Sequence, residues 1–361
     1  MSIIKTNWSK GLAAAVVGLS MLSLTSCNDS FIFDYEGDCS LHYKLNFVYD
    51  MNLKWANAFS NEVKSVRVYA FNEDGELVKV FMNNDATLIS QPGFDIDLDL
   101  PPGTYKLVGW CGIDNTNVTT QSFSAPWTDN LKIEDLDCKL NWKSNAQYPA
   151  YSDDHLQFTF WGELGDVLIE AENEVGGTIY YTMPLIKDTN HLRVQLVQLS
   201  GEPTEVNDFT YTVEAVDGEM NYKNELIGNT EITYLPWNKE NAMAGMDNDG
   251  TGDTKALIYA QTAIVDLDMS RFTVGETETM MLTIRDNETG EISARVPIIQ
   301  YALLSKKYYE EAYGHKMSDQ EFLDRQDEYN MTFFLDEGMK WSYVTIDILS
   351  WRLVVHNYDL N

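Results

Sequence analysis

Short runs of alternating apolar and polar residues, separated by strong turn signals, are the feature of this sequence that most restricts its fold. In residues 41–49, Leu41, Tyr43, Leu45, Phe47 and Tyr49 fall on one face. A period of two is typical of a strand with one buried face. Comparable runs recur at 177–186, 191–199, 209–218, 256–267 and 279–299. Many short strands with turns between them predict an all-β fold of antiparallel β-sandwiches rather than an α/β fold.

Three segments carry hairpin signals. Gly75 ends the turn 73–75 between two β-rich runs, and 285–290 is a similar turn that ends on glycine. Glycine favours both turns because it adopts positive φ without strain. We also expect an antiparallel hairpin over 94–111, turning at Pro101-Pro102-Gly103. Its aspartates at 95, 97 and 99 would form an acidic outer face, because a strand spreads successive carboxylates along a line rather than around a metal ion.

A few short helices are expected among the strands. Residues 52–59 break the alternation and predict a short helical turn. Residues 318–330 predict a helix, since Ser318 and Glu321 have the spacing of a capping box.

The first 26 residues have the pattern of an export signal. Lys5 and Lys10 precede an apolar run over 11–24, which is shorter than the roughly 20 residues of a membrane-spanning helix. Leu24-Thr25-Ser26-Cys27 matches the bacterial lipobox, a motif that implies cleavage before Cys27 and lipid attachment to it. Several acyl chains on one residue hold a protein on a membrane much better than one chain.

The mature chain is long enough for two domains. We predict a signal peptide over 1–26, a lipid-proximal tether over 27–38, an N-terminal β-sandwich over 39–168 and a C-terminal β-sandwich over 169–361.

Three cysteines follow Cys27, so at most one internal disulfide can form. We favour a bond between Cys111 and Cys138, because both lie in the same predicted domain and flank one long connection. Cys39 is an alternative partner. No Cys/His grouping has metal-ligand spacing.

The formal net charge of −31 makes nucleic acid a poor partner, because phosphate backbones repel an acidic chain. The sequence contains no HExxH, no GxSxG and no glycine-rich phosphate loop. The five histidines are scattered. We therefore expect no catalytic residue and no cofactor.

One acidic loop has partial resemblance to a calcium loop. Asp247, Asp249 and Asp253 occupy positions 1, 3 and 7, but position 12 holds Ile258 where an EF-hand has glutamate. This departure favours an ordinary acidic loop over a metal site.

The chain resembles the FimB/Mfa-type minor fimbrial subunits, the lipoprotein anchors of Bacteroidales fimbriae. The matching stretches, which follow one another over most of the mature chain, are GDCSLHYKLNFVYDMNLKWANAFSNEVKSVRVYAFNEDGELV, LPPGTYKLVGWCG, MPLIKDTNHLRVQL, FTYTVEAVDGEMNYKNELI, ITYLPW, LTIRDNETGE, SDQEFLDRQDEYNMTFFLD and SWRLVVHNYDL. The resemblance implies two consecutive transthyretin-like sandwiches, no enzyme activity, and a surface location on the outer membrane through lipid on Cys27.

The same resemblance implies other fimbrial subunits as partners. A subunit of this kind would attach, initiate or limit a surface fimbria through β-strand contacts, in which one chain supplies a strand to the sheet of another. Residues 343–355 are a candidate edge strand for such a contact, and an ordinary internal strand is the alternative.

Two other functions remain open. A surface glycan-binding lipoprotein could use some of the nine tryptophans as a sugar platform, although tryptophans within alternating strands more often pack in cores. A hydrolase with an unfamiliar site would need a deep pocket with clustered acids of perturbed pKa.

Overall fold

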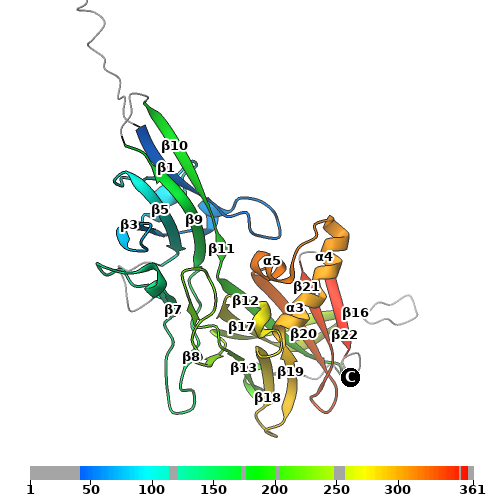
Figure 1. Ribbon diagram of the computed structural model, residues 1–361. Helices are drawn as coiled ribbons and strands as arrows, with labels where there is room; N and C mark the ends of the chain where they lie inside the picture. Colours follow the sequence, from blue (N-terminus) through cyan, green and yellow to red (C-terminus); the bar gives the residue numbers. More distant parts are fainter. Residues whose placement is uncertain are drawn as a thin grey trace, which may run out of the picture. The chain divides into compact units, whose positions relative to one another are not determined.

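The computed structural model describes residues 41–113, 121–171, 176–200, 203–247, 257–348 and 351–356. Over these residues the protein is mostly β, with several antiparallel sheets and a few short helices (Figure 1). This confirms the predicted all-β class.

Two sheets contain the first strands of the chain. The smaller has the order β10 (Gly177–Pro184), β1 (Leu41–Val48) and β4 (Asp95–Asp97). The larger has the order β11 (Ile186–Lys187), β9 (Phe160–Ile169), β5 (Gly103–Cys111), β2 (Val66–Phe71) and β3 (Leu77–Asn83). Every residue of β2 is buried, as expected for a central strand that is covered on both faces.

Two further sheets contain most of the later strands. One has the order β16 (Asn238–Asp247), β17 (Leu257–Ser270), β12 (Thr189–Gln198), β20 (Glu328–Leu335), β21 (Trp341–Ile348) and β22 (Trp351–His356). The other has the order β19 (Ile292–Pro297), β18 (Met281–Asp286), β13 (Phe209–Ala215), β15 (Ile232–Tyr234) and β8 (Tyr151–Ser152). A small third sheet has the order β14 (Glu219–Met220), β7 (Cys138–Leu140) and β6 (Phe123–Ser124).

Two strand pairs are parallel, which the antiparallel prediction did not include. β12 pairs with β20, and β15 pairs with β8. Parallel neighbours need a long connection between them. The connection from β12 to β20 contains all of the described helical segments after residue 200: η3 (Val206–Asp208), η4 (Val274–Glu276), α3 (Ile298–Leu304), α4 (Lys306–Tyr313) and α5 (Asp319–Arg325).

Two of the three predicted hairpins are confirmed. β2 and β3 join at Gly75, with φ 71°, and β18 and β19 join at Gly290, with φ 72°. The hairpin predicted over 94–111 is wrong, because β4 pairs with β1 whereas β5 pairs with β2 and β9. Two consecutive prolines supply no N–H and no positive φ for a tight turn, so the chain crosses from one sheet to another.

The acidic outer face of β4 is present despite this difference. The Lys44 ammonium lies 2.9 Å from the Asp95 carboxylate and 3.4 Å from that of Asp97. Lys79 pairs with Asp99 at 3.1 Å. These aspartates are therefore paired with lysines, as surface groups on a strand commonly are.

The helix predicted over 318–330 is confirmed only in its first part, because α5 ends at Arg325 and residues 328–330 already belong to β20. The Ser318 hydroxyl accepts a hydrogen bond of 3.0 Å from the Glu321 N–H. The helical turn predicted over 52–59 lies further along the chain, because α1 spans Phe59–Glu62 and shares only residue 59 with the predicted segment. Another short helix is α2 (Ala86–Ile89), and η2 (Ile133–Asp135) is a single 3₁₀ turn.

Sheet membership crosses the predicted domain boundary. β10 and β11 follow residue 169 but pair with strands of the first two sheets, while β8 precedes it and pairs with β15. The described residues within 42–171 and 178–356 form one compact unit. The division at 168/169 stays a prediction.

Candidate functional site

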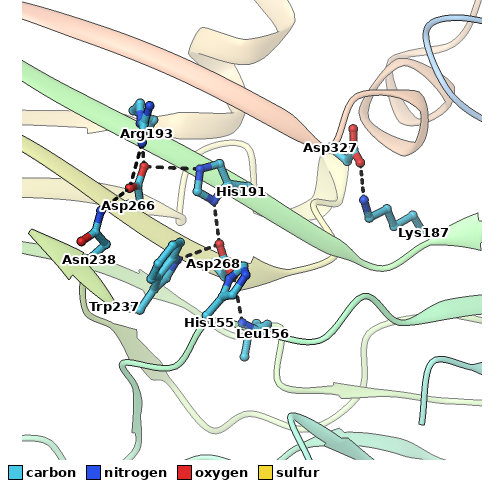
Figure 2. Close-up of polar contacts among 10 residues, drawn as sticks. All are labelled: His155, Leu156, Lys187, His191, Arg193, Trp237, Asn238, Asp266, Asp268 and Asp327. Carbon is cyan, nitrogen blue, oxygen red and sulfur yellow. Dashed lines mark hydrogen bonds and ion pairs between the residues drawn. The ribbon is translucent and has the colours of Figure 1, made fainter. Parts of the chain in front are cut away.

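A cluster of charged and aromatic side chains is centred on the neighbouring strands β12 and β17, and His155 and Trp237 join it from other segments (Figure 2). His191 is the cross-strand partner of Asp268, and Arg193 is that of Asp266. Residues two apart point to the same face of a strand, so both pairs project from one side of the sheet.

Asp268 accepts four hydrogen bonds. Its carboxylate lies 2.6 Å from His155 Nδ1 and 2.7 Å from His191 Nδ1, and it accepts from Trp237 Nε1 at 3.0 Å and from the Leu156 N–H at 2.9 Å. Because a carboxylate only accepts, both histidines carry a proton on Nδ1. Burial raises the pKa of Asp268, but the bonds from His191 and His155 outweigh it and hold that pKa below its usual range.

Asp266 is buried and equally well paired. Arg193 donates to it through Nε at 2.7 Å and Nη2 at 3.1 Å, and Asn238 donates at 2.8 Å. Burial raises its pKa, but the bonds from Arg193 and Asn238 dominate and the pKa is lowered. Both carboxylates already accept hydrogen bonds from several protein donors. These bonds hold residues 155–156 and the start of β16 against the sheet.

Beside the cluster, two hollows of about 620 Å³ and about 190 Å³ share the lining residues Phe158, Lys187, Asp327 and Glu328. We call the two hollows together the polar groove. Lys187 lies at their junction and is buried, and its ammonium pairs with Asp327 at 2.5 Å and with Glu62 at 3.0 Å. The same ammonium lies 3.4 Å from the ring centroid of Phe158.

One wall of the polar groove is the loop 50–58, which is fixed to α5. Arg325 donates to the Asp50 carbonyl at 3.0 Å, and its guanidinium carbon lies 3.5 Å from the Trp55 ring centroid. The Trp55 indole donates to the Tyr309 hydroxyl at 2.9 Å. Trp55 has φ 53°, a left-handed conformation that is unfavourable for a large side chain and persists only where contacts hold it.

The residues singled out from the sequence lie elsewhere. Cys27 and the rival Cys39 are outside the described residues, as are Asp249 and Asp253. Asp247 ends β16, opposite Leu257. Within the described residues no group of three or more His, Cys, Asp or Glu side chains could hold a metal ion.

Cys111 and Cys138 are both buried free thiols in the structure, not the disulfide that we favoured. Cys111 ends β5 and Cys138 begins β7, in two different sheets. Burial raises the pKa of the Cys111 thiol to about 12, which makes it unreactive. The two cysteines lie in the same predicted domain, but the fold does not bond their sulfur atoms to each other.

The histidine–aspartate cluster was not predicted, because the five histidines are scattered in the sequence and their pairing with aspartates on other segments is not visible from the histidines alone. A usable signal was present: His191 and Arg193 alternate in one strand, and Asp266 and Asp268 alternate in another. Opposite charges at the same period of two favour pairing of the two strands. His155 and Trp237 had no such signal.

No helix of the described residues is both long and apolar enough to cross a membrane.

One family model matches most of the chain. The family model for fimbrillin-A associated anchor proteins Mfa1 and Mfa2 matches residues 35–357. A search of curated protein sequences gave no match.

Among solved structures, an adhesin-like protein from Bacteroides thetaiotaomicron is 27% identical, with a TM-score of 0.71 over 88% of this chain and 99% of that one. A candidate polysaccharide-binding protein of the same organism is 20% identical, with a TM-score of 0.70 over the same shares. The fimbrial anchor protein Mfa2 from Porphyromonas gingivalis is 14% identical, with a TM-score of 0.59 over 88% of this chain and 99% of that one. The last two likenesses show the shared fold. Because the family model spans the whole described region, the chain belongs to the family of fimbrillin-A associated anchor proteins.

Proposed function

We propose that this protein is a lipid-anchored subunit that attaches, initiates or limits a surface fimbria through β-strand contacts with other fimbrial subunits. Membership of the anchor family supports a fimbria-associated role at the cell surface. The observation that carries the finer proposal is the lipobox at Leu24–Cys27, which lies just ahead of the matched region. Acyl chains on Cys27 would hold the chain on the outer membrane, leaving the β-sheets free to meet a partner.

The strand contact has a candidate edge. β22 is the last strand of its sheet and pairs with β21, and no other described strand pairs with it (Figure 1). An edge strand presents unpaired N–H and C=O groups that an incoming strand can use. Of the segment 343–355 suggested by the sequence, β21 is internal, so β22 is the part that we propose for the contact.

The attachment is tested by comparing the wild-type chain with Cys27→Ala in native cells, using an epitope tag, pull-down and mass spectrometry. We expect fimbrial subunits to co-purify with the wild type. We expect Cys27→Ala to move protein and fimbriae from the membrane fraction into the medium. Recovery of no fimbrial subunit with the wild type would refute the proposed role, and retention of Cys27→Ala on the membrane would refute the lipid anchor.

The edge contact needs a separate test. Val354 is an exposed residue of β22, and Val78 is an exposed residue of β3, which is also an edge strand. We expect Val354→Glu to reduce co-purification of fimbrial subunits about tenfold, because a buried unpaired charge is unfavourable in a new sheet. Val78→Glu is the matched control. Equal yields from both variants would remove β22 as the contact.

A further inference from the structure

The lining of the polar groove suits ligand binding, which attachment to a fimbria does not require. Its charged side chains largely neutralise one another. Lys187 pairs with Glu62 and Asp327, and Arg325 pairs with Glu321 at 3.0 Å. Two lining side chains of opposite sign, Lys54 and Glu328, make no ion pair within the described residues. The larger hollow is also lined by Asp347, so its lining has three basic and four acidic side chains. The smaller hollow adds Asp268. The groove is therefore polar, with a small net negative charge.

Hydrogen-bonding groups without a protein partner also line the groove. Within the described part of the chain, the side-chain amides of Asn61 and Asn330 make no hydrogen bond, and both line the larger hollow. Each amide can donate and accept at the same time. A ligand that complements them must also offer both kinds of group.

An apolar surface lines the same hollow as these amides. Phe158 is 43% exposed, and one face of its ring is occupied by the Lys187 ammonium. That contact holds the ring at the junction of the two hollows. An exposed ring next to free amides suits a ligand with hydroxyl groups around its edge and an apolar face.

The wall of the groove is held in place before any ligand arrives. The Asn52 side chain donates to the Tyr49 carbonyl at 3.2 Å and to the Ala56 carbonyl at 2.8 Å, closing the loop on itself. Trp55 is held in its left-handed conformation between Arg325 and His315, whose ring centroid lies 4.4 Å away. A fixed wall lowers the entropy lost on binding.

We propose that the polar groove binds a neutral, hydroxyl-rich ligand of the saccharide class, with Asn61 and Asn330 as hydrogen-bonding residues and Phe158 as the ring platform. The volume of about 620 Å³ falls within the range of small-molecule sites, about 300 to 1,000 Å³. The formal charge of −31 on the chain disfavours anionic polymers. Because a fimbrial anchor need not bind glycans, this proposal can fail while the proposed function stands.

The test is affinity electrophoresis of the purified full chain in gels containing dextran, yeast mannan or laminarin, which are three neutral polysaccharides. We expect at least one to retard the wild type. Asn61→Ala and Asn330→Ala should each weaken its affinity about tenfold, which corresponds to one lost hydrogen bond. Phe158→Ala should weaken it at least as much. Circular dichroism melts check that each variant is folded.

Matched controls lie outside the groove. Asn229 is an exposed asparagine and Trp127 is an exposed aromatic residue, and neither lines either hollow. Asn229→Ala and Trp127→Ala should bind like the wild type. The proposal is overturned if no neutral polysaccharide retards the protein, or if the groove variants bind like the controls. Binding of a lysine-rich peptide or of polygalacturonate, with no binding of neutral polymers, would also overturn it.

Discussion

Two buried carboxyl groups, Glu276 and Asp217, should make the stability of this protein depend on pH. Glu276 is 6% exposed, and one of its carboxylate oxygens accepts from the Val216 N–H at 3.1 Å. Asp217 is fully buried and accepts from the Tyr234 hydroxyl at 2.7 Å. Burial raises the pKa of Glu276 to about 7, and burial together with the charge of Glu276 raises that of Asp217.

The sign of the pH effect follows from proton linkage. The folded protein holds a proton on Glu276 at pH values where the unfolded chain, with a pKa near 4.5, has lost it. The resulting contribution to stability is complete below about pH 4.5 and is lost as the pH rises through about 7. This interval of about 2.5 pH units, at about 1.4 kcal/mol per unit, corresponds to about 3.5 kcal/mol.

Glu276→Gln tests this reasoning, because glutamine keeps an acceptor for the Val216 N–H and never ionises. Relative to the wild type, the variant should be about equally stable at pH 4.5 and about 3.5 kcal/mol more stable at pH 8. Urea unfolding followed by tryptophan fluorescence gives both values. Glu278→Gln is the control, since Glu278 is exposed in the same turn. Parallel pH profiles for the wild type and Glu276→Gln would refute the reasoning.

Three further predictions concern other parts of the structure. Trp55→Ala should lower the free energy of unfolding by about 1 to 2 kcal/mol through loss of its ring contact and indole hydrogen bond. Trp55→Gly should cost less, because glycine tolerates the left-handed backbone; a less stable glycine variant would contradict the assigned strain. Asp268→Asn should cost about 3 kcal/mol in urea unfolding, since an amide N–H₂ cannot accept from the donors around it, and a loss below about 1 kcal/mol would contradict its saturation. In peptide maps of the full chain, iodoacetamide should modify Cys111 and Cys138 only after unfolding; a Cys111–Cys138 bridge in a non-reducing map would contradict their assignment as free thiols.

Local patterns in the sequence were sufficient for much of the fold. The face shared by Tyr43, Leu45 and Phe47 is buried in β1, and the turns at Gly75 and Gly290 form where glycine permits them. The Ser318 cap starts α5. Each of these features depends on neighbours within a few residues, which a single sequence displays.

Features that depend on distant residues were not predictable in this way. The parallel pairing of β12 with β20 joins segments more than 100 residues apart, and nothing in either strand specifies the partner. The polar groove likewise combines Asn61, Phe158 and Asn330 from three remote segments. Asn61 and Asn330 have ordinary polar side chains in sequence and acquire a shared role only through the tertiary fold.

The crossing of sheet membership has a mechanical consequence. β8 and β7 belong to the first half of the sequence, yet they pair with β15 and β14 of the second half. A pulling force that separates the two halves must therefore break both of these ladders as well as the loop contacts of Arg325. If the chain is lipid-tethered and bound to a fibre as we propose, it experiences such tension directly. The pairing of β8 and β7 with strands of the second half would make the two halves resist this tension together rather than extend one after the other.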